Sequence, residues 1–188
     1  MWKLIAKGLL RLGGWTVVGE KPTFAKAIFI VAPHTSNWDG VWALIYVVSI
    51  DMRVRFFVKQ SAFVFPLSVL LRILGGIPLD RNEPGSAARK AVDAFEERDS
   101  FYFGLAPEGT RSLKSHWKTG FYRIAKGAGV PIVLGFLDYG KRRIGLGPVI
   151  YPSDDRGADM AGMREFYATI TGRRPEKTSP VVFPGDRV

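Results

Sequence analysis

The chain has 188 residues and no cysteine, so disulfide bonds are excluded. Its length suits one domain with a sizeable hydrophobic core, and the sequence contains no internal repeat or linker. A formal net charge of +10 and a pI near 10.0 favour anionic partners, among them lipid headgroups and nucleic acid. Charge alone does not choose between these partners.

The N-terminal segment Met1–Leu12 is predicted to form an amphipathic helix that ends at a pair of glycines. Basic residues on one helical face and apolar residues with a tryptophan on another are typical of a helix lying in the plane of a membrane surface. The alternative is a terminal helix that packs its apolar side on the core. The basic residues are Lys3, Lys7 and Arg11, and the apolar ones are Trp2, Ile5, Leu9 and Leu12.

The remaining sequence alternates between short apolar runs, typical of buried strands, and stretches with helical spacing. This alternation predicts a single α/β domain with a mostly parallel mixed sheet flanked by helices. A late strand or hairpin is expected over Arg142–Val149. The other predicted strands are Ala27–Val31, Val54–Val58, Gly76–Leu79, Phe101–Leu105 and Ile132–Leu137, and the clearest predicted helices are Ser86–Glu97 and Met160–Ile170.

No apolar segment reaches the ~20 residues needed to cross a bilayer. The run Phe63–Leu74 is broken by Pro66 and Arg72. Its most apolar part, Ser61–Leu71, is predicted to be a buried helix, with a surface that dips into lipid as the alternative. The Pro-rich tail from Arg173 is expected to be loosely held.

The segment Ala32–Asp39 carries a histidine and an aspartate separated by four residues, at the exit of a predicted strand. A neutral histidine that a carboxylate orients can accept a proton from an alcohol near neutral pH. His34 is therefore a candidate base, and Asp39 is its candidate orienting group. Ser36 or Asn37 is expected to cap the following helix. The alternative is an ordinary loop histidine beside a first-turn acid.

Two further strand ends carry polar groups. The turn Pro107–Ser112 contains Gly109, which permits close backbone approach to a ligand, and Arg111, whose planar guanidinium suits phosphate or carboxylate. The run from Gly75 ends in the pair Asp80-Arg81. Because open α/β sheets bind ligands at the carboxyl ends of their strands, these groups are expected to lie near His34.

In this order the segments resemble the motif blocks of the glycerophospholipid acyltransferases, typified by 1-acyl-glycerol-3-phosphate acyltransferase. The resemblance covers about Ile28 to Leu137, and the block Pro107–Ser112 is its most specific part. The other blocks are the pair His34 and Asp39, the run Gly76–Arg81 and the run Gly129–Val133.

The resemblance implies transfer of a fatty acyl group from acyl-CoA or acyl carrier protein (acyl-ACP) to the hydroxyl of a lysophospholipid such as 1-acyl-glycerol 3-phosphate. It implies no cofactor, no metal and no covalent acyl-enzyme, with His34 as general base and Asp39 as its orienting group. The lack of any cysteine and of a Gly-x-Ser-x-Gly motif agrees with a direct attack.

The same resemblance implies the substrate-binding residues. Arg81 would bind the acceptor phosphate and Arg111 would add positive charge, while Glu108, Gly109 and Thr110 of the same block would shape the acceptor site. Lys118 is a weaker candidate, for which a solvated lysine is an equal alternative.

The expected organisation is a single acyltransferase domain over residues 1–188, with a membrane-surface helix at 1–12, a catalytic core at 26–151 and a C-terminal helix and tail at 158–188. The protein is expected to be peripheral, or monotopic, on the cytoplasmic face of a membrane, with an anionic membrane surface as a partner.

Other functions stay open at this stage. The acceptor could be another lyso-lipid, for example lyso-ornithine lipid, or glycerol 3-phosphate itself. A basic nucleic-acid- or membrane-binding module would also explain the charge, but the basic residues are scattered and no nucleic-acid motif is present, so nucleic acid is not expected as a partner. A phosphoryl-transfer enzyme would require a Gly-rich loop with Lys-Ser/Thr, which is missing.

Overall fold

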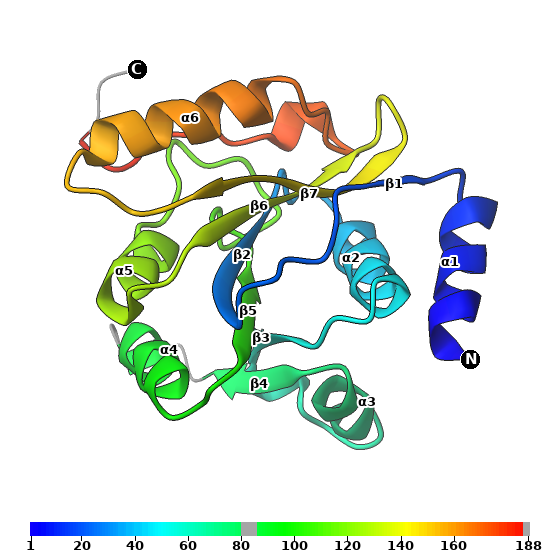
Figure 1. Cartoon of the computed structure of the whole chain (residues 1–188). Coiled ribbons are helices and arrows are strands. Elements are labelled where there is room, and N and C mark those ends of the chain that lie inside the picture. Colours follow the sequence, from blue (N-terminus) through cyan, green and yellow to red (C-terminus); the bar gives the residue numbers. More distant parts are fainter. Residues whose placement is uncertain (80–85, 186–188) are drawn as a thin grey trace.

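A seven-stranded sheet forms the centre of the computed structural model, which describes residues 1–79 and 86–185 (Figure 1). The strand order is β1-β7-β6-β2-β5-β3-β4, and every neighbouring pair is parallel except β6 and β7. The predicted single α/β domain with a mostly parallel sheet is thus confirmed. The strands are β1 (Thr16–Val18), β2 (Lys26–Ala32), β3 (Val54–Lys59), β4 (Gly76–Leu79), β5 (Phe101–Leu105), β6 (Ile132–Asp138) and β7 (Arg143–Ile150).

Helices cover both faces of the sheet (Figure 1). In the central strand β2, Ile28 and Ile30 point into a core with α4, α5 and α6, whereas Ala27 and Phe29 point towards the α2 side. A strand buried on both faces requires a continuous apolar run, which β2 has. The helices are α1 (Trp2–Leu12), α2 (Asn37–Ser49), α3 (Leu67–Ile73), α4 (Ser86–Glu96), α5 (Gly120–Ala128) and α6 (Arg156–Ala168), with 3-10 turns at Gln60–Ala62 and Pro175–Lys177.

Two elements are absent from the sequence prediction. Strand β1 has only three residues and pairs along one edge with β7, too short a pattern to identify from sequence. Helix α5 contains two glycines, which lower helix propensity, and it ends where Gly129 adopts a left-handed conformation with φ of 62°. The late strand is β7, antiparallel to β6.

Helix α1 packs on α2 through a narrow face that holds Ala6 and Leu10, both buried. Trp2, Leu4 and Leu12 are 71%, 72% and 87% exposed. The helix therefore packs on the protein through a face that is neither the predicted basic face nor the predicted apolar face. Much of the predicted apolar face is exposed to solvent.

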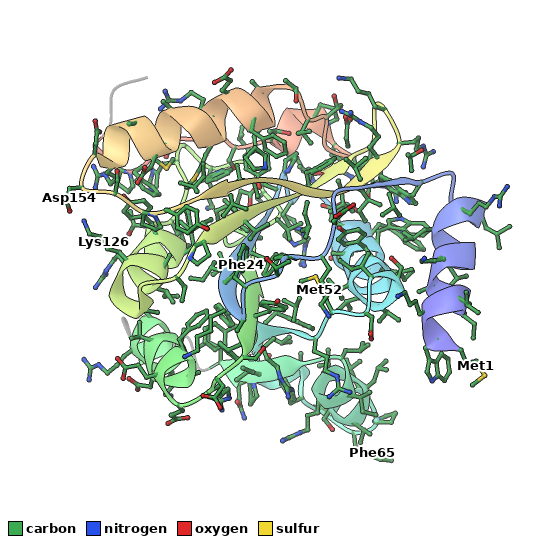
Figure 2. The ribbon with its side chains drawn as sticks, in the orientation of Figure 1. Met1, Phe24, Met52, Phe65, Lys126 and Asp154 are labelled. Carbon is green, nitrogen blue, oxygen red and sulfur yellow. The ribbon has the colours of Figure 1, made fainter. Side chains whose placement is uncertain are left out.

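The prediction that Ser61–Leu71 forms a buried helix is wrong. Helix α3 has no buried residue, because it lies at the edge of the sheet, where its main contact among the described residues is with β4 (Figure 1). Figure 2 shows Phe65, which is 85% exposed, projecting away from the ribbon on the same side of the view as Met1. No helix in the described residues is long and apolar enough to cross a membrane.

The C-terminal tail is also more ordered than its composition predicts. Val182 and Phe183 are buried, and the Val182 carbonyl accepts a hydrogen bond of 2.8 Å from the backbone N–H of Trp117. The Phe183 ring packs against Phe121 and Tyr122, with ring centroids 5.8 Å apart in each pair. The tail thus closes the core over α5, and the expectation of a loosely held segment is wrong.

This packing predicts that Phe183→Ala lowers the free energy of unfolding by about 3–5 kcal/mol, the usual cost of removing a buried phenylalanine ring. Urea unfolding followed by circular dichroism measures the change. The control is Phe65→Ala at an exposed position, which should stay within about 0.5 kcal/mol of the parent. Equal stability of the two variants would show that the tail contributes nothing to the core.

Candidate active site

The carboxyl ends of three neighbouring strands bring the candidate site together. Strand β2 pairs with β5 on one side and with β6 on the other, all parallel. His34 follows β2, Glu108 follows β5 and Tyr139 follows β6. The site therefore lies where polar strand ends are expected to meet.

His34 and Asp39 face each other, with 3.4 Å between the imidazole Nδ1 and the carboxylate Oδ2. The Asp39 side chain is fully buried, whereas that of His34 is 21% exposed. Ser36 caps α2 and forms a capping box with Asp39, which places Asp39 in the first helical turn as predicted. Because Nδ1 faces Asp39, the other ring nitrogen Nε2 is free to face a substrate.

The Asp39 carboxylate is held by more than the capping box. Its Oδ2 accepts the backbone N–H groups of Thr35 at 2.7 Å and Ser36 at 2.8 Å, and its Oδ1 accepts the Tyr139 hydroxyl at 2.8 Å. Burial by itself would raise the pKa of this carboxyl, but the hydrogen bonds, led by that of His34, outweigh burial and lower the pKa below 3.8. Asp39 is therefore ionised and fixed near neutral pH.

Residues 33–36, between β2 and α2, form the loop that carries His34, here called the histidine loop. Glu108 lies next to this loop and is almost fully buried. Its Oε1 accepts the backbone N–H of His34 at 2.9 Å, while its Oε2 is buried with no hydrogen-bond partner. Burial raises the pKa of Glu108 above its usual value, and the hydrogen bond from the His34 amide opposes this only in part. The glutamate thus contacts the backbone that carries the imidazole.

Beside Glu108 in this block, Pro107 is also buried and Thr110 is half-buried, whereas Gly109 lies at the surface. Gly109 has φ of +65°, and a Cβ there would lie 2.8 Å from the Lys118 side chain, which crosses the turn. Arg111 is exposed, and the Thr110 hydroxyl accepts the Ser112 N–H at 3.3 Å. The fold thus brings Lys118 to the turn Pro107–Ser112.

Arg81, the predicted phosphate ligand, lies outside the described residues, together with Asp80. Strand β4, which leads to both, pairs with β3 in parallel orientation. Within residues 1–79 and 86–185, no group of three or more His, Cys, Asp or Glu side chains could hold a metal ion.

Sequence reasoning missed Tyr139 and the segment Thr171–Arg174. Tyr139 follows the buried strand β6, so the strand-end pattern that identified His34 applies to it as well. The segment binds the histidine loop, since the Arg174 backbone N–H donates to Thr35 Oγ1 at 3.1 Å. No local pattern indicates this contact, because its partners lie 139 residues apart.

The arrangement can perform base catalysis on an alcohol. An ionised carboxylate fixes one nitrogen of a partly exposed imidazole, and the other nitrogen can take a proton. Aspartate in this position also stabilises the imidazolium that forms when the proton moves.

Comparison with known proteins places this geometry in context. The family model described as Acyltransferase matches residues 15–133, well over half of the chain. The crystal structure of the 1-acyl-sn-glycerophosphate (LPA) acyltransferase PlsC from Thermotoga maritima is similar, with a TM-score of 0.59 and 18% sequence identity over 91% of this chain and 80% of that one. At this identity the likeness shows the fold alone. No curated protein sequence matches the chain.

The buried Glu108 generates a prediction about stability and pH. Because the pKa of Glu108 is raised in the folded state, the unfolded chain releases this proton first as pH rises above about 4.5. Ionising the buried group therefore costs stability towards neutral pH. Glu108→Gln removes that cost, so its free energy of unfolding relative to the parent should increase as the pH rises above about 4.5.

Urea unfolding at a series of pH values tests this. Glu165→Gln, at an exposed glutamate of α6, serves as the control and should follow the parent at every pH. A difference between Glu108→Gln and the parent that stays constant with pH would contradict a raised pKa of Glu108.

Proposed function

The chain belongs to the acyltransferase family, and from this premise we propose that it transfers a fatty acyl group from acyl-CoA or acyl-ACP to the hydroxyl of a lysophospholipid such as 1-acyl-glycerol 3-phosphate. The observation that carries the proposal is the pair His34 and Asp39 at the carboxyl end of β2, with Asp39 buried and His34 partly exposed.

In the proposed reaction, Nε2 of His34 takes the proton of the acceptor hydroxyl while the oxygen attacks the thioester carbonyl. The carbon–sulfur bond of the tetrahedral intermediate then breaks, and the imidazolium returns the proton to the thiolate. The products are the acylated acceptor and the free thiol of the donor. Asp39 holds the imidazole in one tautomer and offsets its positive charge.

Glu108 has a supporting role in this proposal. By accepting the His34 amide, it fixes the backbone from which the imidazole extends. Accurate placement of a base matters because a misplacement of about 1 Å can cost ~10² in rate.

We assign the acceptor phosphate to the β5 side of the site. Arg111 is exposed and Lys118 lies across Gly109, so the turn offers two cations beside a backbone that a ligand can approach closely. Thr110 shapes the same turn, and Arg81 is the phosphate ligand that family resemblance implies. Other phosphate-bearing acceptors, glycerol 3-phosphate among them, would use these groups equally. A lyso-ornithine acceptor carries no phosphate, so a panel of acceptors read by mass spectrometry separates the two classes.

We further propose that the protein works at a membrane surface, as a peripheral protein on its cytoplasmic face. Two exposed apolar surfaces support this. The first is the side of α1 that carries Trp2, Leu4 and Leu12. The second is the α3 segment Val64–Ile73, in which Phe65 and Ile73 are 85% and 76% exposed. Exposed apolar patches of this kind mark interaction surfaces. A cleft of about 510 Å³ lies beside α1, and His34 does not line it. Its lining includes four basic side chains: Lys3, Lys7, Arg11 and Lys21.

The catalytic proposal predicts that His34→Ala lowers acyl transfer by ~10² to 10⁴ while the fold remains intact, because a positioned base contributes about this factor. Asp39→Asn should be nearly as harmful, since it misorients the imidazole. Turnover on acyl-CoA with a lysophospholipid measures both, and circular dichroism checks folding. His116→Ala, at the second and exposed histidine, is the matched control. A folded His34→Ala with turnover within a few-fold of the parent would reject the base.

The membrane proposal predicts that two kinds of variant weaken vesicle binding differently. Replacing Lys3, Lys7 and Arg11 by Gln should weaken binding to anionic vesicles at low salt, since each cation near a negative surface contributes about 1 kcal/mol that salt screens. Phe65→Ser with Ile73→Ser should weaken binding at low and high salt alike, because burial of apolar area is not screened.

Vesicle co-sedimentation at two salt concentrations measures both effects. Tyr151→Ser is the control, because Tyr151 is also exposed, at 68%, but follows β7 and lies far from α3 in the sheet order. If both sets of variants bind vesicles as the parent does, these surfaces do not meet lipid.

A further inference from the structure

The segment Thr171–Arg174, which follows α6, is fixed against the loop that carries His34. The Tyr139 N–H donates to the Thr171 carbonyl at 2.8 Å, and a Cβ on the buried Gly172 would lie only 3.0 Å from the Pro33 ring. With the bond from Arg174 to Thr35, these contacts position the residue between them, Arg173, beside the candidate site.

Arg173 lies over two aromatic rings of that site. Its guanidinium carbon is 5.6 Å from the centre of the Trp38 ring and 5.9 Å from that of Tyr139. Trp38 directly precedes Asp39, and Tyr139 donates to Asp39. The guanidinium also hydrogen-bonds the Tyr139 side chain, and because a guanidinium carries five N–H donors, further donors remain for an anion.

None of the acidic side chains in the described residues forms an ion pair with Arg173. The nearby Asp39 already accepts four donors, so it does not serve as the partner. Arg173 is exposed, and its orientation is set by the two rings. An oriented arginine without a carboxylate partner is suited to bidentate recognition of phosphate.

The sheet order separates this arginine from the cations of the acceptor side. Strand β2, which leads to His34, lies between β5 and β6. Arg111 and Lys118 belong to the β5 side, whereas Arg173 rests on Tyr139 at the end of β6. Two phosphate-bearing substrates that meet at His34 therefore have cations on both sides of the base, one set on the β5 side and Arg173 on the β6 side.

We infer that Arg173 binds a phosphate group of a substrate, on the side of His34 opposite Arg111. The inference rests on the proposed acyl transfer, in which the donor thioester and the acceptor both carry phosphate. With the acceptor phosphate at the β5 side, the position of Arg173 assigns it to the phosphate of the acyl donor. Loss of one charge-assisted, bidentate contact is expected to weaken binding about tenfold.

The kinetic test compares Arg173→Gln with Arg174→Gln, measured with acyl-CoA and a short-chain soluble acceptor. The control removes the same charge from the neighbouring residue and leaves the backbone bond to Thr35 intact. Arg173→Gln should raise the KM of one substrate about tenfold with kcat little changed, and Arg173→Lys should recover only part of the loss. A raised KM for acyl-CoA assigns the donor phosphate, and a raised KM for the acceptor assigns the acceptor phosphate.

A binding measurement separates this inference from the proposed function. Calorimetric titration of the parent and both variants with free coenzyme A and with glycerol 3-phosphate requires no turnover. Weaker binding of either compound by Arg173→Gln alone supports the phosphate contact even if the parent transfers no acyl group. Unchanged KM and binding in Arg173→Gln, or equal losses in Arg174→Gln, would overturn it.

Discussion

The buried Asp39 carboxylate is the interaction on which the rest of the site depends. A carboxylate removed from water must have its oxygens hydrogen-bonded, because an unpaired buried charge is very costly. Here its partners come from the backbone of its own loop, from His34 and from Tyr139 at the end of β6. The same carboxylate therefore starts helix α2, orients the imidazole and joins two neighbouring strand ends.

These hydrogen bonds fix the histidine loop to neighbouring strand ends. Glu108 holds the loop from the β5 side, and the segment after α6 holds it through Thr35. The glutamate does so at a cost in stability, since one of its oxygens is buried without a partner. Such a cost is common where a polar group is placed for function rather than for folding. A base held from both sides suits a reaction in which two separate substrates must meet at one nitrogen.

The exposed apolar surfaces lie on elements that do not build the histidine site. Helix α1 packs mainly on α2, and α3 lies beside the edge strand β4. Both helices can therefore contact a lipid surface without disturbing the strand ends. This separation is consistent with a protein that takes an amphiphilic substrate from a lipid surface while its polar chemistry stays within the sheet.

The sequence by itself determined the parts of the protein that depend on neighbouring residues. Strand β2 follows from its apolar run, the capped start of α2 follows from Ser36 and Asp39, and the candidate base follows from the same few residues. These features are local. A buried strand or a helix cap involves residues close together in the sequence, so the order of apolar and polar residues is enough to predict it.

Only the tertiary structure decided which distant groups complete the site and which apolar surfaces are covered. Tyr139 lies 100 residues from the carboxylate it contacts, and Arg173 reaches Trp38 from beyond the segment that carries the family motifs. The tail is buried because α5 offers it a place to pack, whereas α3, at the edge of the sheet, has no buried residue. Burial is a property of what surrounds a side chain, so the composition of a segment does not by itself determine it.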